Sequence, residues 1–390
     1  MTEPHALVAD WCRRGRLAGA VVRTGNAAGQ SQTSCHGWMR LEAHQTMRRD
    51  AIFRLASATK LLSSVAAMIL VDRGLLQNLD DPVSKYLVNF KPEVLVNPTW
   101  ARHAWRLVPA HRPVTLRDLL SHTSGLQYGF GINTLDGVYQ DMGFPTWDRC
   151  LAEFVDQISS LPLAFQPGSQ VSYGYGIDVL GHVMETVCKQ PLDRLMRELL
   201  TEPLNMPDTA FFATPEKAAR MVTYYEYCDG QLVPGEPTTR FLSPPAGLSA
   251  GGGWLTGYGG LVSTANDFGR VLAMLLAGGL VDGKPLLSAS SVAEIFRDQT
   301  LMVPAGAGLR YPPALDFPGR GFGLGGAVQS NAATGLLHWG GAPYNTSFVV
   351  DRTLGVYGLF LAQTGPFEGE FVPDGIKATF RQAVRDAARA

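Results

Sequence analysis

The strand-like segments of this chain gather at its two ends, and this distribution constrains the fold more than any other feature. Near the N-terminus, Gly19 to Thr24 is a β-branched run that a Gly-Asn pair ends. Towards the C-terminus, four further segments predict successive strands: Gly321–Gln329, Leu336–Trp339, Thr346–Val350 and Val356–Gln363. We therefore expect one sheet built from both ends of the chain, with a mainly helical domain inserted between them.

Helical patterns occupy most of the remaining sequence. The predicted helices are Ala6–Arg14, Ser57–Arg73, Leu116–Leu120, Trp147–Ser160, Ile177–Lys189, Leu192–Leu200, Ala265–Ala277 and Asp374–Ala388. In the middle of the chain, long loops with proline and glycine separate them. The predicted organisation is an α+β fold, with residues 1–80 and 241–390 forming the sheet domain and residues 81–240 forming the helical insertion.

Charge and composition argue against several classes of protein. The net charge is −1, so there is no excess of basic residues for nucleic-acid binding. The N-terminus has charges where a signal peptide needs an apolar core, and the longest apolar stretch is too short to cross a bilayer. The five cysteines are odd in number and scattered, as in a protein with reduced thiols. We expect a cytoplasmic protein with a small-molecule substrate and no nucleic-acid or membrane partner; its oligomeric state stays open.

An S-x-x-K motif, Ser57-Ala58-Thr59-Lys60, opens the most apolar of the predicted helices. A spacing of three residues places both side chains on one helix face, one turn apart. The helix N-terminus favours developing negative charge at the serine, and a lysine at this distance can help to ionise a hydroxyl. The motif suggests a serine nucleophile with Lys60 as its partner, although Ser57 as a simple helix cap is the alternative.

Two further motifs can complete such a site. A Pro-Gly turn precedes Tyr173, whose phenol can act as a general base or acid when a neighbouring ammonium favours the phenolate. The segment His338-Trp339-Gly340-Gly341-Ala342 lies on a predicted strand, where glycines permit close approach and an N–H can stabilise an oxyanion. A half-buried aromatic residue and a strand-end bulge are the structural alternatives.

The three motifs, in this order, resemble the serine β-lactamase and penicillin-binding-protein superfamily, whose pattern is S-x-x-K, Y-x-N and a K-T-G-like box. The resemblance is closest to the branch of carboxylesterases related to class C β-lactamases (family VIII) and lovastatin-type acyltransferases. Supporting segments include FRLASATK, LRDLLSHTSGL, EPLNMPDT, GGLVSTANDFGRVLAMLL and HWGGAPYNTSFVVDRTLGV, and the similarity runs from about residue 18 to residue 364.

This resemblance implies a fold and a set of roles. It implies an antiparallel sheet flanked by helices, with the active site in the cleft beside the helical domain. It implies Ser57 as nucleophile, Lys60 and Tyr173 as the proton-handling pair, and the N–H groups of Ser57 and Ala342 as the oxyanion hole. The box Trp339-Gly340-Gly341 then contacts substrate. No cofactor or metal is implied.

Two departures from the family pattern bear on the substrate. Trp339 stands where a β-lactamase has the lysine that contacts a β-lactam carboxylate, and Tyr175 stands where Y-x-N has its asparagine. Both changes favour a less polar, ester-type substrate, with Tyr175 among the substrate-binding residues. We expect a serine hydrolase of carboxylic esters. A β-lactamase or D-amino-peptide hydrolase, a dedicated acyltransferase and a catalytically silent binding or scaffold protein are the alternatives.

Other motifs are weaker candidates. Gly247-Leu248-Ser249-Ala250-Gly251 matches G-x-S-x-G, and Asp316 and His338 follow in α/β-hydrolase order, but the neighbouring prolines and glycines suit neither the strand nor the helix of a nucleophile elbow. Residues 321–326 match G-x-G-x-x-G but open no helix. His122 is expected to hold a loop through hydrogen bonds, and His338 either lines the pocket or packs structurally.

Overall fold

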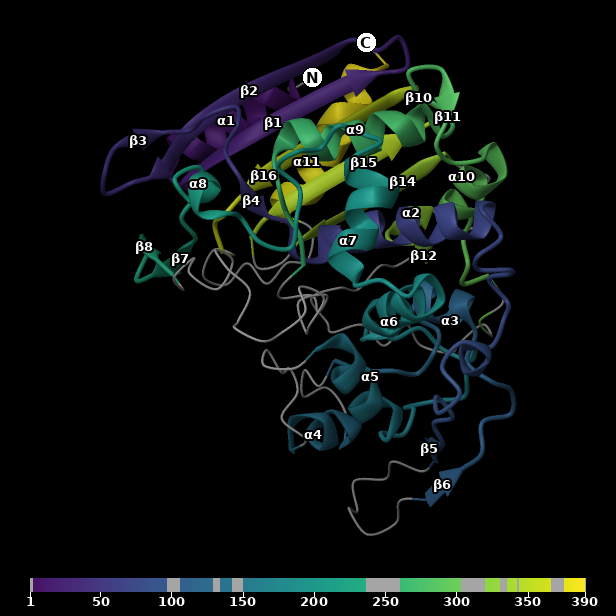
Figure 1. The fold of residues 1–390 in the computed structure, drawn as a ribbon. Coiled ribbons are helices and arrows are strands. Elements are labelled where there is room, and N and C mark those ends of the chain that lie inside the picture. Colours follow the sequence, from purple (N-terminus) through teal and green to yellow (C-terminus); the bar gives the residue numbers. More distant parts are fainter. Residues whose placement is uncertain are drawn as a thin grey trace.

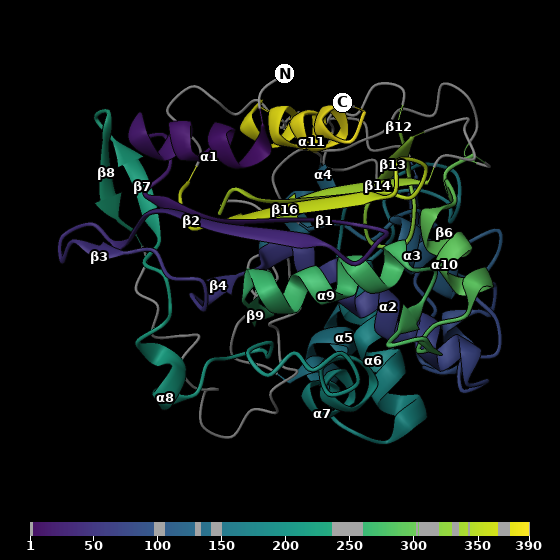
Figure 2. The ribbon, with the colours of Figure 1, turned by 90° about the horizontal axis from the view of Figure 1, so that it is seen from above.

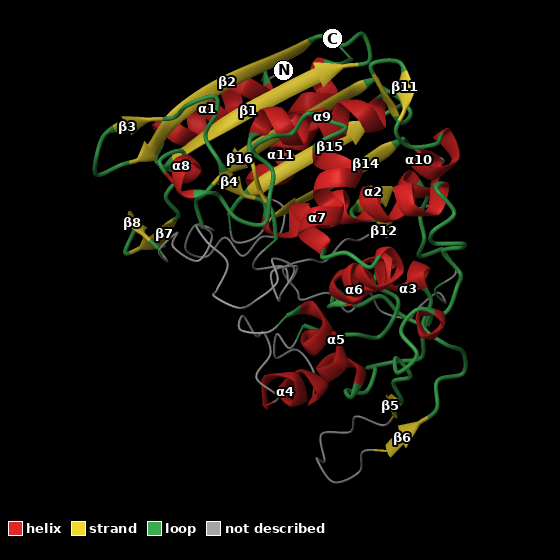
Figure 3. Cartoon of the chain, viewed as in Figure 1, coloured by secondary structure: helices red, strands yellow, loops and turns green. Residues whose placement is uncertain are grey.

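The structure is a computed structural model that describes residues 3–96, 106–128, 134–141, 150–235, 260–301, 303, 320–329, 335–341, 344–365 and 375–389. Figure 1 shows the sheet and its helices at one end of the molecule and a group of helices at the other. Figure 3 shows the same division by element type, with the long strands confined to the first end. The predicted α+β class, with an antiparallel sheet flanked by helices, is confirmed.

The largest sheet of the described residues has eight strands in the order β12-β13-β14-β15-β16-β1-β2-β3, and all its pairs are antiparallel. Its strands are β1 (Gly19–Asn26), β2 (Ser31–Arg40), β3 (Gln45–Thr46), β12 (Arg320–Phe322), β13 (Ala327–Gln329), β14 (Leu336–Gly341), β15 (Thr346–Asp351) and β16 (Val356–Ala362). Strand β1 pairs with β16, from Ala20 opposite Ala362 to Asn26 opposite Val356. The two ends of the chain therefore meet inside one sheet, as the sequence predicts.

Helices cover both faces of this sheet. In Figure 2, α1 (Pro4–Arg13) and α11 (Gly375–Ala387) lie on one face and α9 (Ala265–Leu276) lies on the other. The alternation along β1 explains this arrangement, because successive side chains of a strand point to opposite faces. Ala20 and Val22 belong to the core cluster under α1 and α11, whereas Val21 belongs to the larger cluster that contains α9.

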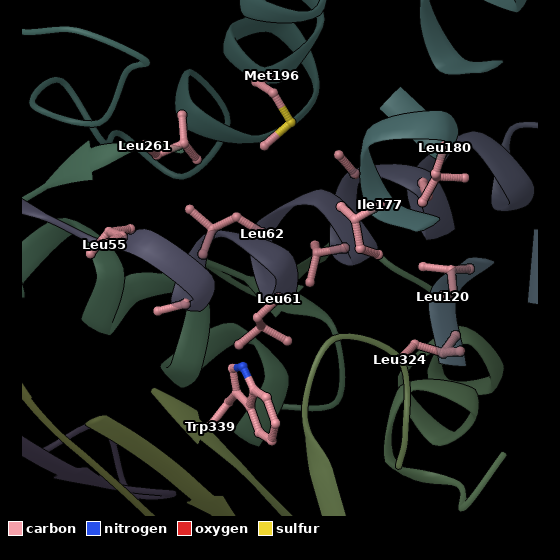
Figure 4. Packing of buried hydrophobic residues seen from close by; sticks show 14 of the residues in the cluster. Leu55, Leu61, Leu62, Leu120, Ile177, Leu180, Met196, Leu261, Leu324 and Trp339 are labelled. Carbon is pink, nitrogen blue, oxygen red and sulfur yellow. The ribbon is translucent and has the colours of Figure 1, made fainter. Parts of the chain in front are cut away.

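Helix α2 (Thr59–Asp72) is the central helix of the molecule. Alanine, leucine, isoleucine and valine dominate its sequence, and its side chains are buried from Thr59 to Leu70. Figure 4 shows Leu61 of α2 between Trp339 and Ile177, and Leu62 on the side of Met196. All five residues belong to one hydrophobic cluster. In the described part of the chain, no helix is both long and apolar enough to span a bilayer. The apolar run of α2 thus joins the sheet to the helical layer.

Shorter elements complete the fold. The remaining helices are α3 (Leu116–Ser121), α4 (Thr134–Asp141), α5 (Leu151–Ser159), α6 (Gly176–Cys188), α7 (Leu192–Met196), α8 (Pro215–Ala218) and α10 (Ala289–Phe296). Paired short strands are β4 (Phe53–Arg54) with β9 (Val262–Ser263), β5 (Val94–Val96) with β6 (Arg106–Val108), β7 (Tyr225–Cys228) with β8 (Gln231–Pro234), and β10 (Leu280–Val281) with β11 (Lys284–Pro285). Bridges from Met221 to Ile52 and from Ala210 to Val262 tie the chain after α7 to the strands beside the sheet. The domain boundaries at residues 80 and 240 stay a prediction.

Two of the differences from the sequence prediction lie in the large sheet. The segment Gly321–Gln329 is not one strand but the hairpin of β12 and β13. Gly325 in its turn has φ +86°, and an added Cβ would lie 2.8 Å from the Cα of Leu61, so only glycine fits against α2. Strand β2 was not predicted, because its sequence SQTSCHGWMR is polar and mostly exposed or half-buried, without apolar alternation.

Candidate active site

The backbone places Ser57 at a sharp corner between β4 and α2. Ser57 lies in a single 3₁₀ turn, Ala56–Ala58, that leads directly into α2. Ala56 before it has φ +45°, a left-handed conformation that costs an alanine free energy, and it is buried. Strain of this kind persists only where the surrounding structure enforces it, and it is common next to reacting groups. No sequence pattern predicts this corner, apart from the motif that follows it.

Strand β14 is one of the elements that hold this corner. At Gly341 an added Cβ would lie 2.3 Å from the carbonyl oxygen of Leu55 and 3.3 Å from the Cβ of Ala56. The glycine therefore lets the strand run against the backbone just before Ser57, as the sequence predicts for a glycine on this strand. Ala342, the predicted second oxyanion donor, lies outside the described residues.

Lys60 is the charged partner of Ser57. Its Nζ lies 3.5 Å from Ser57 Oγ, and its side chain is 2% exposed. The spacing of three residues across the start of a helix places the two groups on the same face, as predicted. A buried ammonium must be compensated by its surroundings, because desolvation of a charge is costly.

Aromatic rings supply part of that compensation. Lys60 Nζ lies 4.8 Å from the ring centroid of Tyr173 and 5.5 Å from that of Tyr128. The quadrupole of each ring attracts a cation at this distance. Tyr173 is itself buried, and its hydroxyl is enclosed by protein. The structure thus brings Ser57, Lys60 and Tyr173 together, and it adds Tyr128, which has no distinguishing sequence motif.

His122 holds the loop that carries Tyr173. It ends α3 in a left-handed conformation, and its carbonyl accepts a hydrogen bond of 2.8 Å from the N–H of Ser172. Its Nδ1 accepts a weaker bond of 3.4 Å from the N–H of Gly174, and its ring packs 4.4 Å from that of Tyr173. Burial, together with Lys60, holds the pKa of His122 well below its ordinary value. The predicted loop-holding role of this histidine is confirmed, and it requires the neutral ring.

The indole of Trp339 forms an aromatic wall of the site. It is buried, with its ring 5.6 Å from Tyr173 and 5.1 Å from Phe322 of β12. The next residue on β14, Gly340, lies against the neighbouring strand, where an added Cβ would be 2.3 Å from the carbonyl oxygen of Thr346. The position that holds lysine in β-lactamases is therefore occupied here by an apolar ring next to the proton-handling tyrosine.

His338 lies away from this cluster, whereas Tyr175 borders it through the ring of Tyr128. His338 lines a cavity of about 680 Å³ on the α11 side of the sheet with Leu7 and Arg381, as expected for the residue before Trp339 on one strand. The alternative in which His338 lines the active-site pocket is wrong. Tyr175 is buried, with its ring 4.5 Å from Tyr128 and 5.1 Å from Phe154 of α5. Its predicted contact with substrate stays a prediction.

The described residues add no support for the weaker candidate motifs as functional sites. Ser249 and Asp316 lie outside the described residues. The G-x-G-x-x-G segment is the β12–β13 hairpin, so it has no helix that could receive a phosphate.

Asp178 is a buried acid next to the site that the sequence analysis did not single out. It lies in the first turn of α6, is fully buried, and has no hydrogen-bond partner for either carboxylate oxygen. Burial raises its pKa to about 7, against the opposing effect of the Lys60 charge. One signal could have revealed it: a single carboxylate flanked by Ile177, Val179 and Leu180 on a predicted apolar helix.

Comparison with known proteins identifies the family. The family model described as Beta-lactamase matches residues 8–379. The chain belongs to the beta-lactamase family. The resemblance inferred from its motifs is thereby confirmed, and the family's members include esterases and acyltransferases of the serine hydrolase superfamily.

Several proteins similar to this chain are named esterases or hydrolases. Esterase EstB of Burkholderia gladioli is 34% identical over 403 residues, which cover 97% of this chain and 92% of that protein. Lovastatin esterase of Penicillium rubens is 28% identical over 95% of this chain and 94% of its own. Among solved structures, EstCE1, titled a hydrolase with promiscuous acyltransferase activity, has a TM-score of 0.78 and 26% identity, covering 99% of this chain and 97% of its own.

The buried, neutral state of His122 predicts a pH-dependent effect of the variant His122→Asn. Below about pH 6.5 the unfolded chain takes up a proton that the folded imidazole refuses, so this residue costs the wild type stability as the pH falls. Asparagine tolerates the left-handed backbone and does not titrate. The melting temperature of His122→Asn minus that of wild type should therefore be about 2 °C larger at about pH 5 than at about pH 7.5.

Thermal melting at the two pH values measures this difference. The matched control is His111→Asn, at an exposed histidine, for which no comparable change is expected. A relative melting temperature of His122→Asn that stays constant or falls towards low pH contradicts a buried neutral imidazole.

Proposed function

We propose that this protein is a serine carboxylesterase that forms an acyl-enzyme on Ser57. The observation that carries the proposal is the 3.5 Å contact between Lys60 Nζ and Ser57 Oγ, made by a buried ammonium that also lies over the ring of Tyr173. A nucleophilic serine needs a neighbouring group that takes its proton and stabilises the charge that develops. The similarity to Esterase EstB and lovastatin esterase supports the same chemistry.

The proposed reaction has two halves. Ser57 Oγ attacks the ester carbonyl while its proton passes to the Lys60–Tyr173 pair, and the same pair returns the proton to the departing alcohol. Water then attacks the acyl-enzyme and releases the acid. The N–H of Ser57, with that of Ala342 as the predicted second donor, would stabilise the oxyanion in both halves.

The proposed substrate is an ester with an apolar acyl or aryl group. Trp339 offers an indole face where recognition of a substrate carboxylate would need a cation. The backbone of Gly340 and Gly341 beside it is proposed to contact the substrate as well. Tyr175 is the further residue proposed to contact substrate. A cytoplasmic location, like the absence of a macromolecular partner, stays a prediction.

Acyl transfer to an alcohol is a second candidate activity. The solved structure of EstCE1 is titled a hydrolase with promiscuous acyltransferase activity, and it shares this fold over nearly its whole length. In the proposed mechanism, an alcohol in place of water would release the acyl group as a new ester. When an alcohol is added, part of the acyl-enzyme should be released as the new ester and the rest as the acid. Chromatography measures the ratio of these two products.

The proposal predicts that Ser57→Ala loses ester hydrolysis and that Ser249→Ala does not. Removal of a nucleophile generally costs at least about a thousandfold in turnover. The assay is the release of nitrophenol from a short-chain nitrophenyl ester, with Ser249→Ala as the matched serine control. Equal loss in both folded variants, or an unaffected Ser57→Ala, contradicts Ser57 as nucleophile. A wild type with no turnover and no burst favours the binding-protein alternative.

A second prediction concerns substrate class. Since Trp339 cannot make a charge-assisted contact with a β-lactam carboxylate, kcat/KM should be at least about tenfold higher for a short nitrophenyl ester than for ring opening of a chromogenic cephalosporin. Trp339→Lys introduces a cation and should reduce the ratio of the two kcat/KM values, ester over cephalosporin. Trp339→Phe keeps an apolar ring and should leave that ratio unchanged. A wild-type enzyme that prefers the cephalosporin would show the β-lactamase alternative to be correct.

A further inference from the structure

The cavity of about 680 Å³ between α11 and the sheet lies apart from the candidate active site. Its lining includes Leu336 and His338, two alternate residues of β14. Leu336 belongs to the core cluster under α1 and α11, whereas Leu337 and Trp339 belong to the cluster on the other face. Because successive side chains of a strand point to opposite faces, the cavity and the indole of Trp339 lie on opposite sides of one strand.

Part of the lining of this cavity is apolar. Side chains from two helices and two strands contribute: Leu7 of α1, Leu336 of β14, Val349 of β15 and Ala378 of α11. Small-molecule sites in proteins have volumes of roughly 300–1,000 Å³ and combine such surface with a few polar groups. Thr379 and Gln382 also line the cavity, and both are exposed on α11, so a small molecule can enter from solvent. The cavity thus has room and apolar surface for a hydrocarbon chain.

A buried arginine is the polar group that gives the cavity its chemistry. Arg381 lines it, is 7% exposed, and donates a hydrogen bond of 3.4 Å from Nη1 to Ser347 Oγ of β15. A guanidinium carries five N–H donors in a planar fork, whose geometry matches the two oxygens of a carboxylate. His338 is buried as well and adds an imidazole, which has an N–H donor in every protonation state.

The charge of the lining favours an anion. Its charged members among the described residues are Arg381, Arg385 and Asp386, two cations and one acid. Arg385 Nε lies 2.8 Å from Asp351 Oδ2, and Asp386 Oδ1 lies 3.3 Å from Arg389 Nη1. These two ion pairs fix the arginine and the acid beside Arg381. An anion that enters the cavity therefore meets a net positive lining.

We propose that this cavity is a second binding site, which takes a monocarboxylate with an apolar chain. Arg381 and His338 donate hydrogen bonds to the carboxylate, and the chain lies along the apolar lining. Acids of this class are what the proposed function would release from apolar esters. The site itself does not depend on that function, because all of its groups lie on the opposite face of the sheet from Trp339.

The first test compares three probes by isothermal titration calorimetry of the wild-type protein: octanoate, acetate and 1-octanol. Acetate lacks the chain, and 1-octanol lacks the charge. Octanoate should bind with a Kd at least about tenfold lower than that of either, since burial of the chain and a charge-assisted hydrogen bond both contribute. Absence of octanoate binding, or equal affinity for octanoate and 1-octanol, overturns the proposal.

The second test locates the octanoate. Arg381→Met removes the cation and keeps an unbranched side chain, so the Kd for octanoate should rise at least about tenfold. Ala378→Phe places a ring in the cavity and should raise the Kd similarly; it also tests the site if Arg381→Met does not fold. The matched control is Arg13→Met, at an exposed arginine of α1 outside the lining, which should leave the Kd unchanged.

An unchanged Kd in a folded Arg381→Met or Ala378→Phe overturns the proposal, because octanoate then binds elsewhere, such as at the candidate active site. An equal rise in Arg13→Met overturns it as well. None of these measurements needs turnover. A wild type that binds octanoate in this cavity but hydrolyses no ester refutes the proposed function alone.

Discussion

The buried ammonium of Lys60 is the interaction on which the candidate site depends. Desolvation of a cation is costly, and the fold offsets that cost with the hydroxyl of Ser57 and the faces of Tyr173 and Tyr128. The same charge influences its surroundings, since it adds to the effect of burial that keeps His122 neutral. A site organised around one buried charge is sensitive to every neighbour that carries or accepts a proton.

The fold surrounds this charge with three separate segments, which it holds around the N-terminus of α2. The sheet contributes β14, whose Gly341 runs against the backbone before Ser57. The loop between α5 and α6 contributes Tyr173, and His122 at the end of α3 fixes that loop. Helix α2 is buried along most of its length, so its first turn cannot move without disturbing both the sheet and the helical layer. Local strain at Ala56 is tolerated for the same reason.

Sequence patterns predicted the features of fold and site that depend on local residue spacing. They missed the features that depend on burial in the folded protein. The S-x-x-K spacing predicted the contact of Ser57 with Lys60, and apolar runs predicted the meeting of β1 with β16 in one sheet. Strand β2 was missed because polar side chains line a strand that has little to bury. The hairpin at Gly325 depends on a positive φ and on close contact with α2, which no pattern encodes. Asp178 was missed because a carboxylate becomes unusual only when the fold removes it from water.

The most direct test of the account asks whether Lys60 and Tyr173 act as one unit. Ester turnover is measured for Tyr173→Phe, Lys60→Met and the double variant, with thermal melting as the control for folding. Tyr173→Phe retains the ring that faces the ammonium and removes the hydroxyl alone. If the two residues act as one unit, each single variant loses most activity and the double variant is little worse than either, because residues that work as a unit are strongly non-additive. Additive losses, or full activity in a folded Tyr173→Phe, would contradict action as one unit.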